Sequence, residues 1–338
     1  MREGLSESPT ADGSARRLDV FFTIDVEVWC DGWRDIDAKF PDAFRRYIHG
    51  PTPKGQYGLP FQLRLLNESG LRAVCFVEPL FAMRFGSDPL AEIVALVRDA
   101  GHEPQLHLHT EWVDEARVPL FPGVTGKRQY LRQFSLAEQS TLIKAGRKLL
   151  AQAGAPDVAA FRAGSFGFNR DTLRALQRNG MSIDSSYNAT MFGPDSGVMT
   201  GGTLYDVALI DEMLEFPMTV FQAGSLRPRH VQLGACSYAE IEGLLWRALE
   251  AGQRSFVILS HNFELLNPSQ TGVDEVVVNR LRRLCAFFGR NTDSFYVRGF
   301  DGLDRIAGAG GGLDRPLTSP LWQAGTRTLE QIYRRRYR

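Results

Sequence analysis

The alternation of short apolar runs with amphipathic segments is the feature that most constrains the fold of this chain. The chain contains seven strand-like runs, six between residues 18 and 220 and a seventh at 255–261. Helix-like segments separate most of them. Alternation of this kind requires a mostly parallel sheet, because each helical crossover returns the chain to the same end of the sheet. The seven runs are LDVFFTID (18–25), LRAVCFVE (71–78), EPQLHLH (103–109), VAAFRAG (158–164), MSIDSS (181–186), DEMLEFPMTV (211–220) and SFVILSH (255–261).

The segments between these runs carry the boundary signals of helices. The segment 135–154 opens with a capping box, in which Ser135 and Glu138 stand three residues apart. The segment 88–101 has a proline near its start and a glycine after its end. The fold class is therefore α/β, and the periodicity fits a closed barrel and an open sheet equally well. Further helices are expected over residues 60–70, 169–180, 237–252 and 272–289.

The composition argues against several classes of protein. The chain has 39 basic and 39 acidic residues among 338, so its charge gives no reason to expect nucleic acid as a partner. No apolar run reaches about 18 residues, which argues against stable membrane insertion. The polar start lacks the apolar centre of a secretory signal, so we expect a cytoplasmic protein. The four cysteines form no Cys-x-x-Cys pair, which indicates neither a zinc ribbon nor a redox pair.

Three segments are expected along the chain. Residues 1–17 are polar and rich in Ser and Gly, which is typical of a disordered N-terminus. Residues 18–307 would form one catalytic domain. Residues 308–338 would form a flexible joint, GAGGGLDRP, followed by a basic helix that ends in RRRYR. Contact with anionic lipid or a diphosphate-linked glycan is one interpretation of this tail, and a solvated end is the simpler one.

Candidate metal ligands follow two of the predicted strands. Asp25 and Glu27 stand two residues apart at a strand end, so they point the same way if the strand continues. Two such carboxylates repel each other unless a proton or a cation lies between them. His107, His109 and Glu111 alternate in the same manner, and imidazole with carboxylate suits zinc and its neighbours. A solvated strand end and a wet strand face are the structural alternatives.

Three further polar residues lie at the ends of other strands. Arg162 precedes a glycine-rich loop, where its planar guanidinium could hold a carboxylate. Asp184 is followed by two serines, so a local turn competes with a functional role. His261 follows five apolar residues and stands where it could transfer a proton near neutral pH. Because the carboxyl ends of parallel strands meet at one end of the sheet, these residues are expected to converge.

The ordered set of motifs resembles the polysaccharide deacetylase family, the NodB-homology or family-4 carbohydrate esterases. Within that family, the sequence looks most similar to the deacetylases associated with lipopolysaccharide and O-antigen biosynthesis. The resemblance spans about residues 19–262 and implies a deformed (β/α) barrel of about seven parallel strands. It also implies metal-dependent hydrolysis of an N-acetyl group from an amino sugar. The matching motifs are TIDVE (23–27), GHEPQLHLHTE (101–111), FRAGSFG (161–167), IDSS (183–186) and LSH (259–261).

The same resemblance implies a role for each candidate residue. Asp25 corresponds to the general base and Arg162 to the residue that holds it, while His261 corresponds to the general acid. Asp184 would be the partner of that histidine. The implied ligands of a divalent ion are listed here: Glu27, His107 and either Glu111 or His109. Zinc is the first choice of metal, with cobalt and nickel as alternatives.

The first two motifs depart from the commonest family pattern. Val26 occupies the position of the usual metal-binding aspartate, and Glu111 falls where a second histidine is usual. The ion would then have a more carboxylate-rich site than the family normally provides. Trp112 and Phe166 are candidates for stacking against a sugar ring, with loop packing as the alternative. His102 and Glu103 lie at a helix-to-strand turn, where a structural role is expected.

The expected partner is an N-acetylated saccharide on a nucleotide, a lipid or a glycan, and the sequence does not indicate an oligomeric state. Two other functions compete with sugar deacetylation. One is hydrolysis of a non-sugar amide, as in a deformylase. The other is a carbohydrate-binding pseudoenzyme, in which the altered ligands have ended catalysis.

Overall fold

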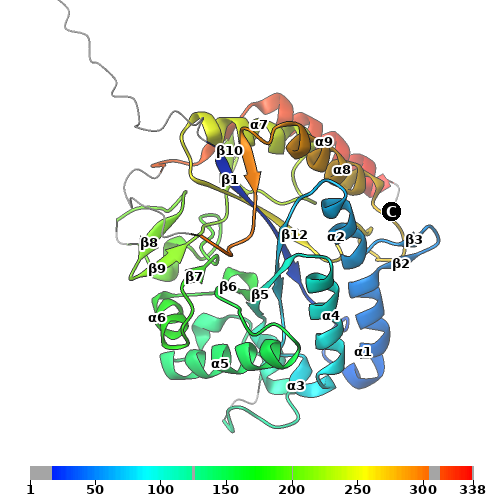
Figure 1. Cartoon of the computed structure of the whole chain (residues 1–338), viewed down its shortest axis with the longest axis vertical. Helices are drawn as coiled ribbons and strands as arrows, with labels where there is room; N and C mark the ends of the chain where they lie inside the picture. The colour runs from blue at the N-terminus through cyan, green and yellow to red at the C-terminus, as the bar shows by residue number, and fades with distance from the viewer. Residues whose placement is uncertain (1–16, 124–125, 200, 304–312, 337–338) are drawn as a thin grey trace, which may run out of the picture.

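A curled, mostly parallel sheet forms the centre of the structure, a computed structural model that describes residues 17–123, 126–199, 201–303 and 313–336 (Figure 1). The strand order is β12-β1-β4-β5-β6-β7-β9-β8, and only the β8–β9 pairing is antiparallel. The strands are β1 (Leu18–Val26), β4 (Ala73–Val77), β5 (Glu103–Leu108), β6 (Ala160–Ala163), β7 (Ile183–Asp184), β8 (Ala208–Ile210), β9 (Met213–Glu215) and β12 (Ser255–His261).

The sheet curls into a barrel that is closed by irregular backbone. On one side of β1, β13 (Phe295–Val297) pairs with its first residues and β4 pairs with its later ones. Beyond β12, the N–H of Val257 donates to Thr219 Oγ1 at 2.8 Å, and the N–H of Leu233 donates to the carbonyl of Leu259 at 2.8 Å. The expected deformed barrel of about seven parallel strands is therefore confirmed.

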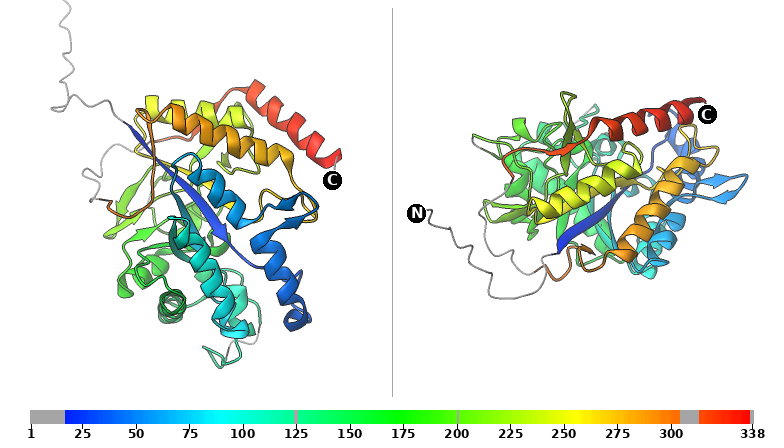
Figure 2. Two further views of the ribbon diagram at one scale, coloured as in Figure 1. Left: turned by 45° about the vertical axis from the view of Figure 1, so that its right-hand side comes forward. Right: turned by 90° about the horizontal axis from the view of Figure 1, so that it is seen from above.

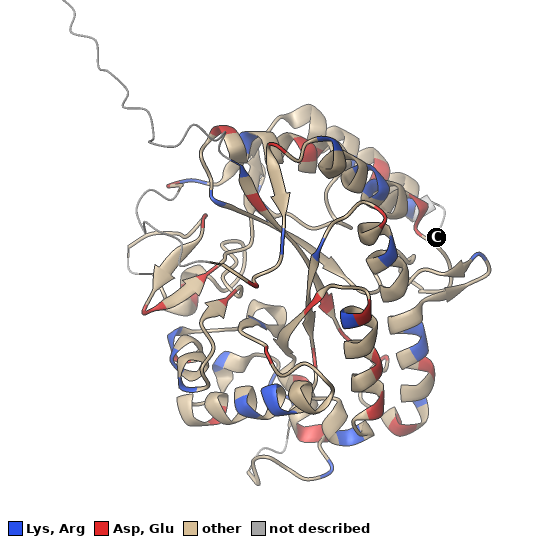
Figure 3. Cartoon of the chain, viewed as in Figure 1, with Lys and Arg blue, Asp and Glu red and all other residues tan. Residues whose placement is uncertain are grey.

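Helices cover the outer face of the sheet (Figures 1 and 2). All six expected helices, five between predicted strands and one after the last, are present, as α2 (Leu59–Asn67), α4 (Asp88–Asp99), α5 (Leu136–Gln152), α6 (Arg170–Arg178), α7 (Tyr238–Glu250) and α8 (Glu275–Arg290). The capping box of α5 forms as predicted, since Ser135 Oγ accepts from the N–H of Glu138 and the Glu138 carboxylate accepts from the N–H of Ser135. Figure 3 shows basic and acidic residues interspersed over these helices.

Several elements have no counterpart in the sequence-based prediction. The hairpin of β8 and β9 turns at Asp211 and Glu212, which both have positive φ, and neither residue type is the glycine that usually marks such a turn. A second small sheet has the order β11-β10-β14. The other additions are α1 (Ile36–Phe44), a π-helical turn (Arg45–His49), β2 (Pro51–Thr52), β3 (Gly55–Gln56), α3 (Ala82–Phe85), β10 (Val220–Ala223), β11 (Arg229–His230) and β14 (Leu317–Ser319).

Two apolar cores lie on the two sides of the sheet. In β1, Phe22 and Ile24 pack outward under the helices, whereas Phe21 packs inside the barrel against Phe216 and Phe300. Successive side chains alternate between the faces of a strand. Odd-numbered residues of β1 therefore point inward, and this parity directs the side chain of Asp25 into the C-terminal mouth of the barrel.

The chain ends carry the remaining predictions. The predicted disordered N-terminus lies outside the described residues except for Arg17, and so does the first part of the predicted joint. A helix, α9 (Leu321–Arg336), is present where the basic helix is expected. Among the described residues, none of the helices combines the length and the apolar character needed to cross a membrane.

Candidate active site

A pocket of about 370 Å³ opens at the C-terminal mouth of the barrel. Asp25 and His261 both line it, because β1 and β12 are neighbours and these two residues are paired in their register. Polar atoms of Asp25, Glu27 and His261 lie within 4.8 Å of one another. The structure thus brings together residues that are 236 positions apart in the chain. The full lining is Asp25, Glu27, Trp29, His109, Glu111, Gln129, Ala163, Ser165, Phe166, His230, Gln232, Leu259 and His261.

Two imidazoles and one carboxylate converge beside this pocket. His107 Nε2 lies 3.1 Å from Glu27 Oε1, and His109 Nε2 lies 2.8 Å from the same oxygen. Both histidines point inward because they alternate with Leu106 and Leu108, which pack under the helices. All three polar side chains are buried. Two nitrogens and one oxygen on a buried face are the donor set of many catalytic zinc sites, which leave one position for water or substrate.

The second nitrogen of each imidazole is held by an acceptor. His107 Nδ1 lies 2.8 Å from the carbonyl oxygen of Arg162, and His109 Nδ1 lies 3.3 Å from Glu111 Oε2. A carbonyl or carboxylate oxygen only accepts, so in a neutral, metal-binding imidazole Nδ1 would carry the proton and the lone pair of Nε2 would face the site beside Glu27. Orientation of this kind is typical of metal-binding histidines, whose outer nitrogen donates to a carboxylate or a carbonyl. The donor set therefore fits a divalent cation.

The charges of this cluster are strongly coupled. Burial alone would raise the pKa of Glu27, but the charge of His109 and hydrogen bonds from His107 and His109 hold that pKa well below its usual value. Burial opposes the charged form of His109, yet Glu27 and Glu111 raise its pKa well above the ordinary range. One carboxylate oxygen of Glu27 and the Nε2 atoms of His107 and His109 meet at one point. They therefore need a positive charge between them, either a proton or a metal ion.

The structure separates the two candidates for the third ligand. His109 Nε2 belongs to the cluster, whereas Glu111 contacts His109 from the far side of the ring. A second donor set, Asp25, Glu27 and His261, shares only Glu27 with the first. Arg162 already donates to Asp25 in that second set. The set made of Glu27, His107 and His109 is therefore the better site for a cation.

Arg162 is a fully buried arginine that holds Asp25. Its Nη1 donates to Asp25 Oδ1 at 2.6 Å and to Thr23 Oγ1 at 2.9 Å. Its Nε and Nη2 donate to the carbonyl and the hydroxyl of Ser185 at 3.1 and 3.0 Å. The guanidinium lies 4.3 Å from the centre of the Phe76 ring. With its donors satisfied by β1 and by the residue that follows β7, Arg162 fixes one oxygen of Asp25, and the other oxygen, Oδ2, lies 4.0 Å from His107 Nε2.

Glu27 is held in place by two residues outside the predicted ligand set. The indole N–H of Trp29 donates to Glu27 Oε2 at 2.8 Å. Asn262 accepts from the backbone N–H of Glu27 at 3.0 Å and donates to its carbonyl at 3.0 Å. Asn262 directly follows His261, so these two hydrogen bonds join the residue after β12 to the residue after β1. In the sequence, Asn262 directly follows the candidate His261, and this adjacency was the available signal for its role. An asparagine after a strand is also common in turns, so the signal was weak.

Asp184 is not where the resemblance implies. Its register partner in β6 is Phe161, which packs under the outer helices, and Ser185 is the neighbour that reaches Arg162. Asp184 instead accepts from Ser186 Oγ at 2.6 Å and interacts with Glu215, its register partner in β9. The expectation that Asp184 partners His261 is therefore corrected, because β7 turns that side chain to the opposite face of the sheet.

The carboxyl pair formed by Asp184 and Glu215 predicts a loss of stability at high pH. Burial raises the pKa of both groups, and the charge of Asp184 helps to raise that of Glu215 well above 4.5. The folded state therefore keeps a proton that the unfolded state releases above about pH 4.5, so stability falls as pH rises toward the folded pKa. Glu215→Gln should become more stable relative to the wild type by about 1.4 kcal/mol for each pH unit in that window.

Urea unfolding of both proteins between pH 4 and pH 9 measures this difference. Glu212→Gln is the matched control, since Glu212 lies three residues away in an exposed turn and should follow the wild-type profile. Parallel profiles for Glu215→Gln and the wild type would show that the pair does not share a proton.

The predicted aromatic contacts have different positions. Phe166 lines the pocket, where it and Ser165 both have positive φ in the turn after β6. Non-glycine residues in this conformation are uncommon and often mark functional loops. Trp112 is buried in a cluster with Trp29 and Trp33, at ring distances of 6.4 and 4.9 Å. Trp112 packs behind Trp29, which lines the pocket, and its role as a substrate contact stays a prediction.

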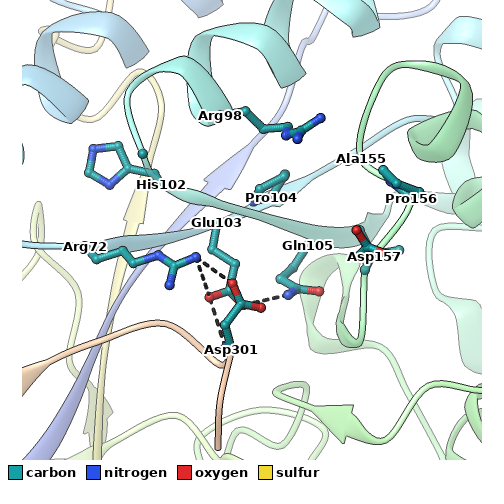
Figure 4. Close-up of a pocket in the computed structure, with 12 residues that line it drawn as sticks. Arg72, Arg98, His102, Glu103, Pro104, Gln105, Ala155, Pro156, Asp157 and Asp301 are labelled. Carbon is teal, nitrogen blue, oxygen red and sulfur yellow. Dashed lines mark hydrogen bonds and ion pairs between the residues drawn. The ribbon is translucent and has the colours of Figure 1, made fainter.

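His102 and Glu103 have the structural role expected of them. His102 Nδ1 accepts from the N–H of Ala73 at 3.0 Å. Glu103 lies at the opposite end of the barrel from the candidate active site and accepts from the N–H groups of Phe300 and Asp301 at 3.2 and 3.3 Å (Figure 4). Arg72 pairs with Asp301 at 2.6 Å in the same place. This end of β5 therefore ties the segment after β13 to the barrel.

The fold and this donor set define a class, an α/β barrel with a candidate metal site at its C-terminal mouth. Comparison with solved structures adds the type of barrel. A crystal structure from Mycobacterium smegmatis, provisionally named a polysaccharide deacetylase, is 19% identical over 88% of this chain and 92% of that chain, with a TM-score of 0.52. This chain therefore has the fold of polysaccharide deacetylases. A scan against protein-family models and a search of curated proteins find no match.

Two other solved structures are more distantly similar. A family-4 carbohydrate esterase from Streptomyces lividans, in complex with acetate, is 16% identical, with 80% of this chain and 88% of that chain covered and a TM-score of 0.38. A CE4 family pseudoenzyme from Bacillus anthracis is 12% identical, with 86% and 67% covered and a TM-score of 0.40.

Proposed function

We propose that this protein is a metal-dependent deacetylase that hydrolyses the N-acetyl group of an amino sugar. One observation carries the proposal: a three-ligand cluster, two members of which line the pocket, lies beside an arginine-held aspartate and a histidine that line the same pocket. Hydrolysis of an amide needs a polarised carbonyl, a water that loses a proton and a nitrogen that gains one. The three parts of the site correspond to these needs.

Glu27, His107 and His109 would hold the ion. When bound, a divalent ion there would polarise the acetyl carbonyl and make water more acidic. Zinc suits two imidazoles and one carboxylate, and cobalt or nickel would accept the same donors. Glu111 would fix the ring of His109 from outside the cluster.

Asp25 and His261 would move the protons. Asp25, held by Arg162 through one oxygen, takes a proton from the attacking water with the other. His261, its neighbour across β1 and β12, donates a proton to the departing nitrogen. The C–N bond breaks as this proton arrives, and the products are an amine and acetate. The Arg162 contact holds Asp25 in one orientation through these steps, which preserves its alignment with the water.

The pocket lining favours a sugar as the substrate. Trp29 and Phe166 offer aromatic surface, and the side chains of Gln129, Gln232 and His230 offer hydrogen-bonding groups. Amino sugars present hydroxyl groups and an apolar ring face to such a lining. The carrier of the sugar, a nucleotide, a lipid or a glycan, is not determined by these residues. The lipopolysaccharide-type substrate and the cytoplasmic location remain predictions from the sequence.

A direct assay of the released acid tests the proposal. The metal-loaded protein is incubated with N-acetylated nucleotide sugars and with N-acetylated oligosaccharides, and acetate is measured by an enzyme-coupled assay. Acetate release with equal formation of free amine is the expected result. Formate release from formamides without acetate release would favour the deformylase alternative. Binding of saccharide without either product would favour the pseudoenzyme.

The role of His261 predicts a dependence on the leaving group. His261→Ala should lower kcat for an N-acetyl sugar by about 10²- to 10³-fold, because the nitrogen must be protonated to leave. The same variant should lose less than about tenfold on an aryl acetate, whose phenolate leaves without a proton. Steady-state rates on the two substrates give the ratio. His49→Ala, which removes an outer histidine paired with Glu92, is the control and should change neither rate. Equal losses on both substrates would exclude His261 as the general acid.

A further inference from the structure

The last helix, α9, presents its polar side to the protein and its apolar side to the exterior. Gln323, Ala324 and Arg327 are buried, and Arg327 contacts Glu240 of α7. Trp322 and Leu329, by contrast, are 65% and 69% exposed. A surface helix of a globular protein normally has the reverse arrangement, with its apolar stripe facing the core. The exposed stripe consists of Leu321, Trp322, Leu329, Ile332 and Tyr333.

Ion pairs fix this orientation of α9. Arg327 pairs with the buried Glu240 of α7. The other two pairs join α9 to α8 and to the residue before it: Glu330 with Arg280, and Arg334 with Asp274 at 2.6 Å. Figure 2 shows α9 on the outer side of α7 and α8. Three pairs spaced along one side of the helix hold it so that it cannot rotate its apolar residues inward.

The basic end of α9 lies at the same end of the barrel as the candidate active site. Arg334 donates to the carbonyl of Gly234, two residues after Gln232 of the pocket lining. Asp274, its ion-pair partner, ends the loop that follows His261. The sequence continues from Arg334 with Arg335 and Arg336. The apolar stripe thus leads toward a basic end near the mouth of the pocket.

We propose that the exposed face of α9 docks on an anionic lipid surface. An apolar stripe with Trp and Leu, followed by clustered arginines, is the pattern of a helix that lies in the plane of a membrane interface. The one acidic residue of the described helix, Glu330, is engaged by Arg280. A second copy of this chain would bring the same apolar stripe and the same arginines, without an acidic group on α9 to pair with them. Anionic headgroups supply the missing charge, and acyl chains accept the stripe.

This docking goes beyond the proposed deacetylation, because it concerns where the protein acts. The pocket mouth and the basic end of α9 lie at one end of the barrel, so a docked protein would hold its pocket near the lipid headgroups. A substrate carried on a lipid would then reach the site without leaving the membrane.

Vesicle co-sedimentation of the full chain tests the docking without any turnover. The wild type should bind vesicles of phosphatidylcholine mixed with phosphatidylglycerol, and bind far less to phosphatidylcholine alone or at high salt. The double variant Trp322→Ser/Leu329→Ser should bind at least roughly tenfold more weakly than the wild type, because it loses apolar area that the membrane would bury. Each of Arg335→Gln and Arg336→Gln should cost roughly fivefold. Tyr296→Ser is the control, because Tyr296 is 44% exposed in β13, which pairs with the first residues of β1 at the opposite end of the barrel, and it should bind like the wild type.

Light scattering on the same proteins distinguishes docking on lipid from pairing of the stripe with a second copy of the chain. A wild type that binds neither vesicle overturns the docking proposal. A wild-type dimer that becomes a monomer in the double variant, without vesicle binding, would assign the stripe to a second copy of the chain. Retained vesicle binding by the double variant, with unchanged thermal stability, would also overturn it. None of these readouts depends on deacetylase activity, so the two proposals fail independently.

Discussion

Asp25→Asn should lower kcat/KM for the N-acetylated substrate by about 10³- to 10⁴-fold while the protein stays folded. Asn keeps the size of Asp and can still accept the hydrogen bond from Arg162, which lies 2.6 Å from Asp25 Oδ1. It cannot take a proton from water near neutral pH. Progress curves of acetate release measure the loss, and thermal unfolding with metal content shows whether the fold and the ligand cluster remain.

The same strand supplies the control for this variant. Asp19 lies at the other end of β1, 3.5 Å from Arg298. Asp19→Asn therefore removes a carboxylate from the same strand without touching the pocket, and it should keep full activity. Substantial turnover by Asp25→Asn would exclude Asp25 as the base and would leave its buried pair with Arg162 as a purely structural feature.

His109→Ala should lose the bound metal, whereas Glu111→Ala should keep it more weakly. His109 Nε2 is part of the donor cluster, and Glu111 acts only through the other nitrogen of that ring. Loss of an outer partner typically costs about 10- to 100-fold in metal affinity. Loss of one of three ligands costs more, so His109→Ala should lose the metal on dialysis and its activity with it. Elemental analysis and zinc titration against a competing chelator measure the two affinities.

Asp114→Ala is the matched control for the loss of an acidic group. Asp114 lies in the same short helical segment as Glu111, but it pairs with Lys127 at 2.5 Å and should leave zinc binding unchanged. If Glu111→Ala loses metal as fully as His109→Ala, then Glu111 is a ligand and the donor set proposed here is wrong. A wild type that takes up no zinc, cobalt or nickel would favour the pseudoenzyme.

The sequence was sufficient for the parts of the molecule that depend on local pattern. The apolar runs and the helices between them predicted a mostly parallel sheet of about seven strands, because burial on both faces and crossover helices leave periodic traces in a sequence. The ends of those strands also identified Asp25, Glu27, His107, Arg162 and His261 as residues of one site. This worked because parallel strands bring their carboxyl ends to one end of the sheet.

Where the sequence left alternatives or misplaced a residue, the deciding quantity was the direction of a side chain. A polar residue at the end of a strand points to one face or the other, and a shift of one residue in register reverses that choice. Asp184 faces the outer helices and Ser185 faces Arg162. The motif IDSS alone does not predict which of these two side chains points into the barrel. The hairpin at Asp211 and Glu212 was missed for a different reason. Its turn has positive φ at two residues but contains no glycine, which is the usual sequence signal for such a turn.

The sequence by itself thus determined the α/β class, the parallel direction of most strands and the residue types available for metal binding and proton transfer. Only the tertiary structure decided that His109 joins Glu27 and His107, that Asp184 pairs with Glu215, and that α9 exposes its apolar side. The physical reason is that periodicity records how much of a segment is buried, whereas contacts between distant segments depend on strand register and on ion pairs between distant elements.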